Sequence, residues 1–190
     1  MRLFVEHHLH DFLEITFSGK SFLKYDGFRD FLEKHLPVKR IEDLKIPLHI
    51  IASNFDTGEY EVFTEGELVP RILASCTIPV IFPPIKINGT RYVDGGLFMN
   101  LPVSPIRPLC DTIIGINVNP YLTDDGKDNI LYVAAKSFQY IFNANTANER
   151  QLCDILLEMD DVDEFNTFDL GSAKKIYHIG CRKMRELLNI

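Results

Sequence analysis

The run Tyr92-Val93-Asp94-Gly95-Gly96 contains the side chain in this sequence that is best suited to chemistry. Asp94 follows a predicted strand, and a carboxylate at a strand end can accept a proton from a nucleophile or orient one. Gly95 and Gly96 have no Cβ, so other backbone can approach them closely. Taken alone, however, Asp-Gly-Gly is more typical of a simple turn. The residues around it must decide between the two interpretations.

A tight hairpin is predicted to position Asp94. Asn88-Gly89 separates the short segments 85–87 and 90–93, which are suited to strands. This dipeptide is the strongest short signal for a two-residue hairpin, because both turn positions need a positive φ. The second strand would end at Val93, so the hairpin would place Asp94 just past the strand end.

The remaining elements alternate between strands and helices. Strands are predicted at residues 47–53, 60–64, 112–118 and 154–158, and helices at about 2–16, 26–36, 67–75, 130–148 and 172–188. This alternation predicts an α/β domain with a largely parallel sheet. A length of 190 residues is consistent with a single domain over residues 1–190.

The segment 73–102 resembles the patatin-like phospholipase family. That family shows a small-residue helix end, an I-P-x-x-F-P-P run, a hairpin, a Y-V-D-G-G/A run and then N-x-P. The corresponding residues here are Ala74-Ser75-Cys76, Ile78-Pro79, Phe82-Pro83-Pro84, the run around Asp94, and Asn100-Leu101-Pro102. A weaker similarity covers most of the chain after about residue 25.

The resemblance implies a serine acyl hydrolase on a three-layer, modified α/β-hydrolase-like domain. Asp94 would be the aspartate of a Ser–Asp dyad and would act as the general base for the serine. The serine attacks an ester carbonyl, an acyl-enzyme forms, and water releases the acyl group. The implied substrate is a lipid or another acyl ester, reached through peripheral membrane contact and without a cofactor.

Two parts of the resembled family are absent from these 190 residues. One is a glycine-rich loop that donates backbone N–H groups to the oxyanion, and the other is the G-x-S-x-G elbow that carries the serine. No two of the 11 glycines are four residues apart, so no G-x-S-x-G can occur. We therefore expect a domain that is incomplete at its N-terminus and inactive alone. Unpaired strand edges would favour self-association or pairing with the missing N-terminal portion.

Other interpretations of the absent serine stay open. The chain could be a non-catalytic interaction or regulatory module that kept the fold, or one half of a split enzyme. Among the chain's own serines, Ser53 has the most suitable position because it follows a buried strand, but it lacks the glycines of an elbow. Ser75 is better explained as a helix-end residue.

Composition argues against several other classes. The net charge of −7 disfavours a nucleic-acid partner. The four cysteines are widely spaced, offer no zinc or redox pair, and favour a reducing, cytoplasmic compartment. No stretch approaches the roughly 18 apolar residues of a membrane span. The cluster His7, His8 and His10, the acidic run 160–164 and the turn-like 124–126 lack the pattern of a metal site, so no metal is expected.

Overall fold

The computed structural model describes residues 14–15, 23–24, 26–118, 130–159, 162, 165 and 170–189. Its helices are α3 (Asp26–His35), α4 (Leu68–Ser75), α5 (Gly96–Met99), α6 (Ile130–Gln151) and α7 (Ala173–Leu188). Its strands are β1 (Glu14–Ile15), β2 (Leu23–Lys24), β3 (Ile50–Asn54), β4 (Glu59–Phe63), β5 (Ile85–Ile87), β6 (Thr90–Asp94), β7 (Ile114–Asn117) and β8 (Ile155–Glu158).

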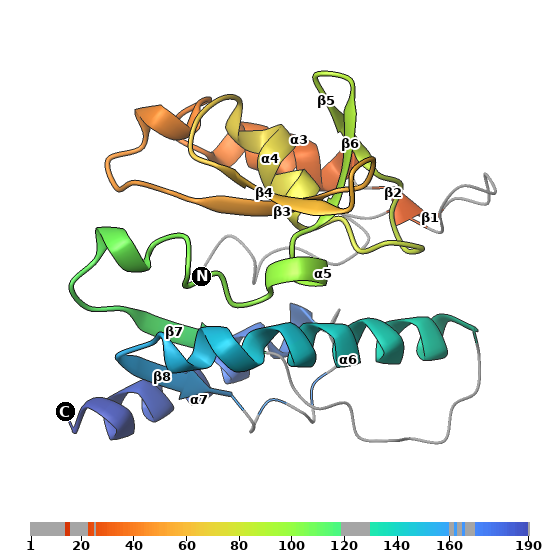
Figure 1. Cartoon of the computed structure of the whole chain (residues 1–190). Coiled ribbons are helices and arrows are strands. Elements are labelled where there is room, and N and C mark those ends of the chain that lie inside the picture. Colours follow the sequence, from red (N-terminus) through yellow and green to blue (C-terminus); the bar gives the residue numbers. More distant parts are fainter. Residues whose placement is uncertain are drawn as a thin grey trace.

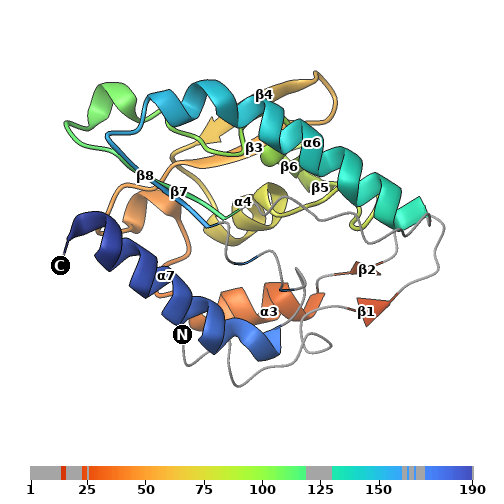
Figure 2. The same cartoon turned by 90° about the horizontal axis from the view of Figure 1, so that it is seen from below.

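The described elements form two groups with the short helix α5 between them. Figure 1 shows β3, β4, β5 and β6 together with α3 and α4 in the upper group, and β7, β8, α6 and α7 in the lower group. Seen from below, the β7–β8 ribbon lies between α6 and α7 (Figure 2). Helix α5 contacts both β3 and α6, so the segment directly after Asp94 joins the two groups.

The α/β class predicted from the sequence is confirmed, and the strand pairing is mixed. The four-stranded sheet has the order β4-β3-β6-β5 with antiparallel neighbours, whereas β7 and β8 pair in parallel. The sequence had favoured largely parallel pairing. The difference arises because β3 and β4, and likewise β5 and β6, are joined by tight turns, and only antiparallel strands can be joined in this way.

The hairpin that carries Asp94 forms as predicted. Asn88 and Gly89 both have positive φ angles, of 50° and 94°. Ile85 pairs with Tyr92 and Ile87 with Thr90, so the two-residue turn sets the register of β5 against β6. The register places Asp94 at the end of β6, opposite Ala52 of β3.

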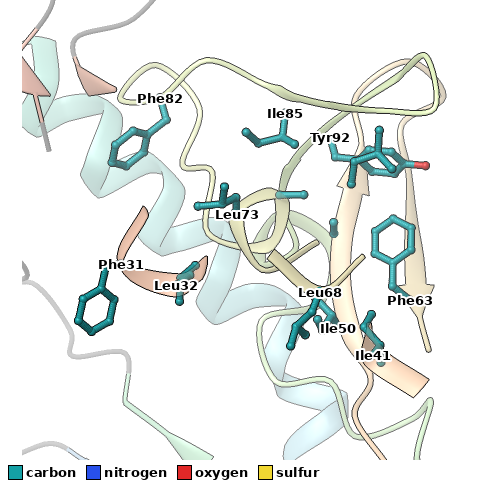
Figure 3. Packing of buried hydrophobic residues seen from close by; sticks show 13 residues of the cluster. Phe31, Leu32, Ile41, Ile50, Phe63, Leu68, Leu73, Phe82, Ile85 and Tyr92 are labelled. Atoms are coloured by element: carbon teal, nitrogen blue, oxygen red, sulfur yellow. The ribbon is translucent and has the colours of Figure 1, made fainter. Parts of the chain in front are cut away.

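Helix α4 packs against the four-stranded sheet and forms the main core with it. Its fully buried Leu68 and Leu73 lie against side chains from the strands, and α3 adds Phe31 and Leu32 (Figure 3). The strand residues of this core are Ile50, Ala52, Phe63, Ile85, Ile87 and Tyr92. This packing fixes β3, β6 and the C-terminal end of α4, which are the three elements that surround Asp94.

The outer face of β7 is apolar and exposed. Ile114, Ile116 and Val118 keep 50%, 53% and 59% of their surface in contact with solvent, whereas the alternate residue Ile113 is buried. Leu157 of β8 pairs with Ile116, so its side chain lies on the same face of the ribbon, where it packs with Ile176 and Ile179 of α7. Helix α7 therefore covers this face over β8, whereas the side chains of β7 on the same face stay about half exposed.

The predicted elements agree with the described ones to within a few residues, with one correction. The helix expected at about residues 2–16 mostly lies outside the described residues, but its last part, Glu14–Ile15, is a strand that pairs with Leu23–Lys24. The β-branched side chain of Ile15 favours a strand over a helix.

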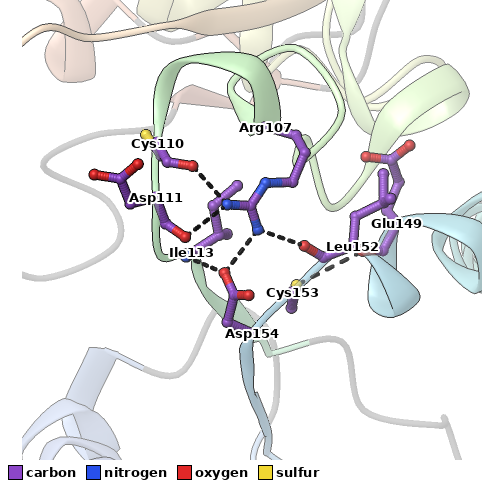
Figure 4. A network of polar contacts seen from close by, with 8 residues as sticks. All are labelled: Arg107, Cys110, Asp111, Ile113, Glu149, Leu152, Cys153 and Asp154. Carbon is purple, nitrogen blue, oxygen red and sulfur yellow. Dashed lines mark hydrogen bonds and ion pairs between the residues drawn. The ribbon is translucent and has the colours of Figure 1, made fainter.

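Arg107 connects the loop before β7 to the segment before β8 (Figure 4). Its guanidinium donates to the carboxylate of Asp154 at 2.7 Å and to the carbonyl of Leu152 at 3.2 Å. It also donates to the carbonyls of Cys110 and Asp111, at 2.5 and 3.0 Å. The fork geometry of arginine allows one side chain to serve all four acceptors. Arg107 therefore sets the spacing between the two parallel strands.

Replacing Arg107 with Met should lower the free energy of unfolding by about 1 to 3 kcal/mol, because several backbone carbonyls lose their donor. Urea denaturation followed by circular dichroism measures this change. Arg29→Met, at an exposed position of α3, is the matched control and should leave the transition midpoint nearly unchanged. Equal effects of the two substitutions would show that Arg107 does not hold the strands together.

Candidate active site

The backbone of Asp94 is fixed from two sides. Its N–H donates to the carbonyl of Thr77 at 2.8 Å, and its own carbonyl accepts a bond of 2.8 Å from the hydroxyl of Ser53. Thr77 follows α4 and Ser53 lies on β3, so two elements of the main core hold Asp94 at the end of β6. This arrangement leaves the side chain, rather than the backbone, available for chemistry.

The two glycines after Asp94 have distinct roles. A Cβ at Gly95 would collide with the backbone carbonyl of Ile51, so only glycine lets the chain pass this close to β3. The N–H of Gly96 donates to Oδ1 of Asp94 at 2.8 Å. A Cβ at Gly96 would lie 3.0 Å from the same carboxylate oxygen. The close backbone approach expected from the sequence is confirmed at Gly95.

Asp94 lines a cavity of about 410 Å³. Most of the wall is apolar, and its apolar lining residues are Leu48, Ile50, Ile51, Ile72, Met99 and Pro102. The polar residues that line it together with Asp94 are His49, Ser75, Cys76 and Asn100. A carboxylate in such a wall faces a space that would suit an apolar ligand with one reactive polar group.

Burial changes the acid–base properties of the site. It raises the pKa of Asp94 to about 6, and the N–H of Gly96 offsets part of this rise by stabilising the charged form. Burial of its thiol, followed by the negative charge of Asp94, raises the pKa of Cys76 to about 11, although part of this residue remains exposed. At neutral pH Asp94 is therefore ionised, whereas Cys76 stays a thiol and is a poor nucleophile.

The serines near Asp94 do not form a nucleophile elbow. Ser53 is 1% exposed, and its hydroxyl donates to the backbone carbonyl of Asp94 rather than to its carboxylate. Ser75 lies in the cavity wall but ends helix α4, as the sequence suggested. The geometry gives Ser53 a structural role.

Several contacts of the site had no signal in the sequence. Thr77 is fully buried, and its hydroxyl donates to the carbonyl of Leu73 at 2.6 Å. This bond fixes Thr77, whose own carbonyl accepts the N–H of Asp94. Asn145 of α6 bonds to the backbone after Asp94 from about fifty residues further along the chain. Single polar residues in a helix carry no pattern that would reveal such partners.

Other features singled out in the sequence give no second site. The histidines at 7, 8 and 10, the turn at 124–126 and the acidic residues of the run 160–164 lie outside the described residues. Within the described part of the chain, no three His, Cys, Asp or Glu side chains gather as metal ligands would. None of the described helices is long and apolar enough to span a bilayer.

Together these features define an α/β domain with a half-buried carboxylate at a strand end beside an apolar cavity. The model of the patatin-like phospholipase family matches residues 3–106, which are 104 of the 190 residues. The chain belongs to this family.

The relatives of the chain agree with this assignment. It is 22% identical to a lysophospholipase NTE1 of Saccharomyces cerevisiae over 88% of its own length and 12% of that protein. It is 29% identical to an NTE family protein of Mycobacterium bovis over 56% of its length and 30% of that protein. A lysophospholipase NTE1 of Cryptococcus neoformans is 30% identical over half of the chain. The chain thus spans less than a third of each of these longer relatives.

The raised pKa of Asp94 predicts how Asp94→Asn changes stability with pH. Above about pH 6 the folded protein must hold a charge that burial disfavours, so the neutral Asn should make it more stable by about 1 to 3 kcal/mol at pH 7.5. As the pH falls below 6, folded Asp94 becomes protonated before the unfolded chain does. The advantage of Asn should then shrink by more than half by about pH 4.5. Urea denaturation at both pH values measures it.

Asp56→Asn is the control with the opposite sign. The backbone N–H and the guanidinium of Arg91 hold the pKa of Asp56 below its usual range. This variant should be less stable than wild type at pH 7.5, with a penalty that falls toward acid. An Asp94→Asn effect that is destabilising at pH 7.5, or independent of pH, would contradict the burial of the Asp94 charge.

Proposed function

We propose that this chain carries the aspartate half of a lipid acyl hydrolase site, with Asp94 as the general base of a Ser–Asp dyad. The observation that supports this most directly is the place of Asp94 among the residues that line a largely apolar cavity. Gly95 and Gly96 support the role, because Gly95 allows the tight passage and Gly96 donates to the carboxylate.

The acid–base properties of Asp94 suit this role. With a pKa of about 6, Asp94 is ionised near neutral pH and is more basic than an ordinary carboxylate. It would take the proton from a serine hydroxyl as the serine oxygen bonds to the ester carbonyl carbon. That proton then passes to the leaving alcohol as its bond to the carbonyl carbon breaks. In the second step Asp94 takes a proton from the water that attacks the acyl-enzyme, and returns it to the serine oxygen as the acid is released.

The walls of the cavity favour a lipid acyl ester as the substrate. An acyl chain in this cavity would meet apolar lining residues such as Ile72 and Met99, and its ester would have to lie beside Asp94. The yeast relative is named a lysophospholipase, so lysophospholipids are the first substrates to test. A lipid supplied from a bilayer would bring the protein into peripheral contact with the membrane surface.

The serine and the oxyanion donors would come from a segment outside these 190 residues, since no G-x-S-x-G occurs within them. The sheet offers such a segment a place to pair at Ile50. On the β6 side of β3, β6 pairs only with Ala52–Asn54 and Gly95 packs against Ile51, so Ile50 has no strand partner there among the described residues. The exposed face of β7 offers a second apolar surface for the same segment or for self-association.

A complementation experiment tests this function. The purified 190-residue chain should not hydrolyse lysophosphatidylcholine or a p-nitrophenyl acyl ester. Fusion of the glycine-rich and G-x-S-x-G segment of a patatin-like relative before residue 26 should produce hydrolysis and serine labelling by a fluorophosphonate probe. Asp94→Asn in the fusion should lower kcat by about 100-fold or more, as expected for loss of a general base.

The control in the fusion is Asp56→Asn, which should keep the activity. A folded fusion that hydrolyses no ester would favour the alternative of a non-catalytic interaction or regulatory module. Turnover by the 190-residue chain alone, lost in Asp94→Asn, would instead show that the nucleophile lies within it. Recovery of a small G-x-S-x-G protein with the native chain would identify a split enzyme.

A further inference from the structure

Helix α5, directly after Asp94, is a single turn that cannot be stable by itself. It spans Gly96–Met99, and the N–H groups of Phe98 and Met99 donate to the carbonyl of Gly95, which precedes the helix. A helix of one turn leaves most of its backbone groups without a partner inside the helix. Its position must therefore be set by partners from outside.

Asn145 of α6 supplies three of these partners with one side chain. Its Nδ2 donates to the carbonyls of Gly96 and Leu97, at 2.7 and 3.2 Å. Its Oδ1 accepts the N–H of Asn100 at 3.0 Å. An amide is the one neutral side-chain group that can both donate twice and accept in this way. Both ends of α5 are thus bonded to the same residue of α6.

Glu149 continues the same contact one turn further along α6. Its Oε2 accepts the N–H groups of Val103 and Ser104, at 2.9 and 2.6 Å. Residues 145 and 149 are four apart and therefore share a helix face. This face of α6 holds the backbone from Gly96 to Ser104 through side-chain contacts.

Gly96 joins this contact to the carboxylate. Its carbonyl accepts from Asn145, and its N–H donates to Oδ1 of Asp94 at 2.8 Å. We propose that Asn145 is a positioning residue for Asp94, which keeps the Gly96 N–H on the carboxylate by holding α5 in place. The name positioning residue rests on the proposed function of Asp94 as a base, but the contact itself can be tested without any activity.

The test measures the titration of Asp94 in Asn145→Ala. The side-chain carbon of Asp94 is followed by ¹³C NMR from pH 4 to 9, with the signal assigned by its absence in Asp94→Asn. Without Asn145 the Gly96 N–H is no longer fixed on the charged form, so the pKa of Asp94 should rise by about 0.5 to 1. His49 and Cys76 are the other titratable groups in the cavity wall, and neither is changed.

Two controls separate positioning from a general loss of stability. Glu149→Gln weakens the neighbouring contact and should lower the urea midpoint without moving the Asp94 titration. Asn148→Ala, at an exposed position of α6, should change neither quantity. An unchanged Asp94 pKa in a folded but destabilised Asn145→Ala would overturn the proposal and leave Asn145 a purely structural role.

A second measurement keeps the proposal testable if Asn145→Ala does not fold. In the wild-type chain the ¹⁵N–¹H signal of Gly96 should titrate with the same pKa as the carboxyl of Asp94, and Asn145→Ser should reduce that pH response. A Gly96 signal that does not respond to the Asp94 titration would overturn the proposal. Neither NMR result depends on hydrolysis. A negative NMR result would overturn the positioning role of Asn145, whereas an active fusion that keeps its activity with Asp94→Asn would overturn the proposed function.

Discussion

The constraint on which the site depends is the partial burial of the Asp94 carboxylate beside a largely apolar cavity. Burial disfavours the charged form, and the hydrogen bond from Gly96 offsets only part of that cost. A fully compensated carboxylate, like that of Asp56 beside Arg91, is a weak base because its charge is already satisfied. Partial compensation leaves Asp94 ionised yet ready to accept a proton, which is the property a general base needs.

Such a group must be held by something other than its own side chain. The carbonyl of Thr77 and the hydroxyl of Ser53 bind the backbone of Asp94, and the packing of α4 on the sheet fixes both. After Asp94, the close contact of Gly95 with Ile51 and the hydrogen bonds between α5 and α6 fix the path of the backbone. Contacts from both groups of elements therefore hold the partly buried carboxylate in place, and the two sets of contacts meet at Gly96.

Local signals in the sequence were sufficient to predict the hairpin and the place of Asp94. Asn88-Gly89 specifies its own turn, and that turn sets the register of β6. The pairing order β4-β3-β6-β5 could not be predicted in the same way, because it depends on contacts between distant segments. The role of Asn145 is likewise invisible in the sequence, since an asparagine on a helix shows nothing of the backbone it will meet. The helix predicted at about residues 2–16 was wrong at Glu14–Ile15, because a short apolar run there fits the spacing of a strand as well as that of a helix.

The most direct test of the central claim is the pKa of the Asp94 carboxyl in the folded wild-type chain, measured by ¹³C NMR. A value near 6 is expected, well above the 3.8 of an unperturbed aspartate. A value at or below 3.8 would show that the carboxylate is solvated or fully paired. In that case the cavity beside Asp94 would not hold a general base.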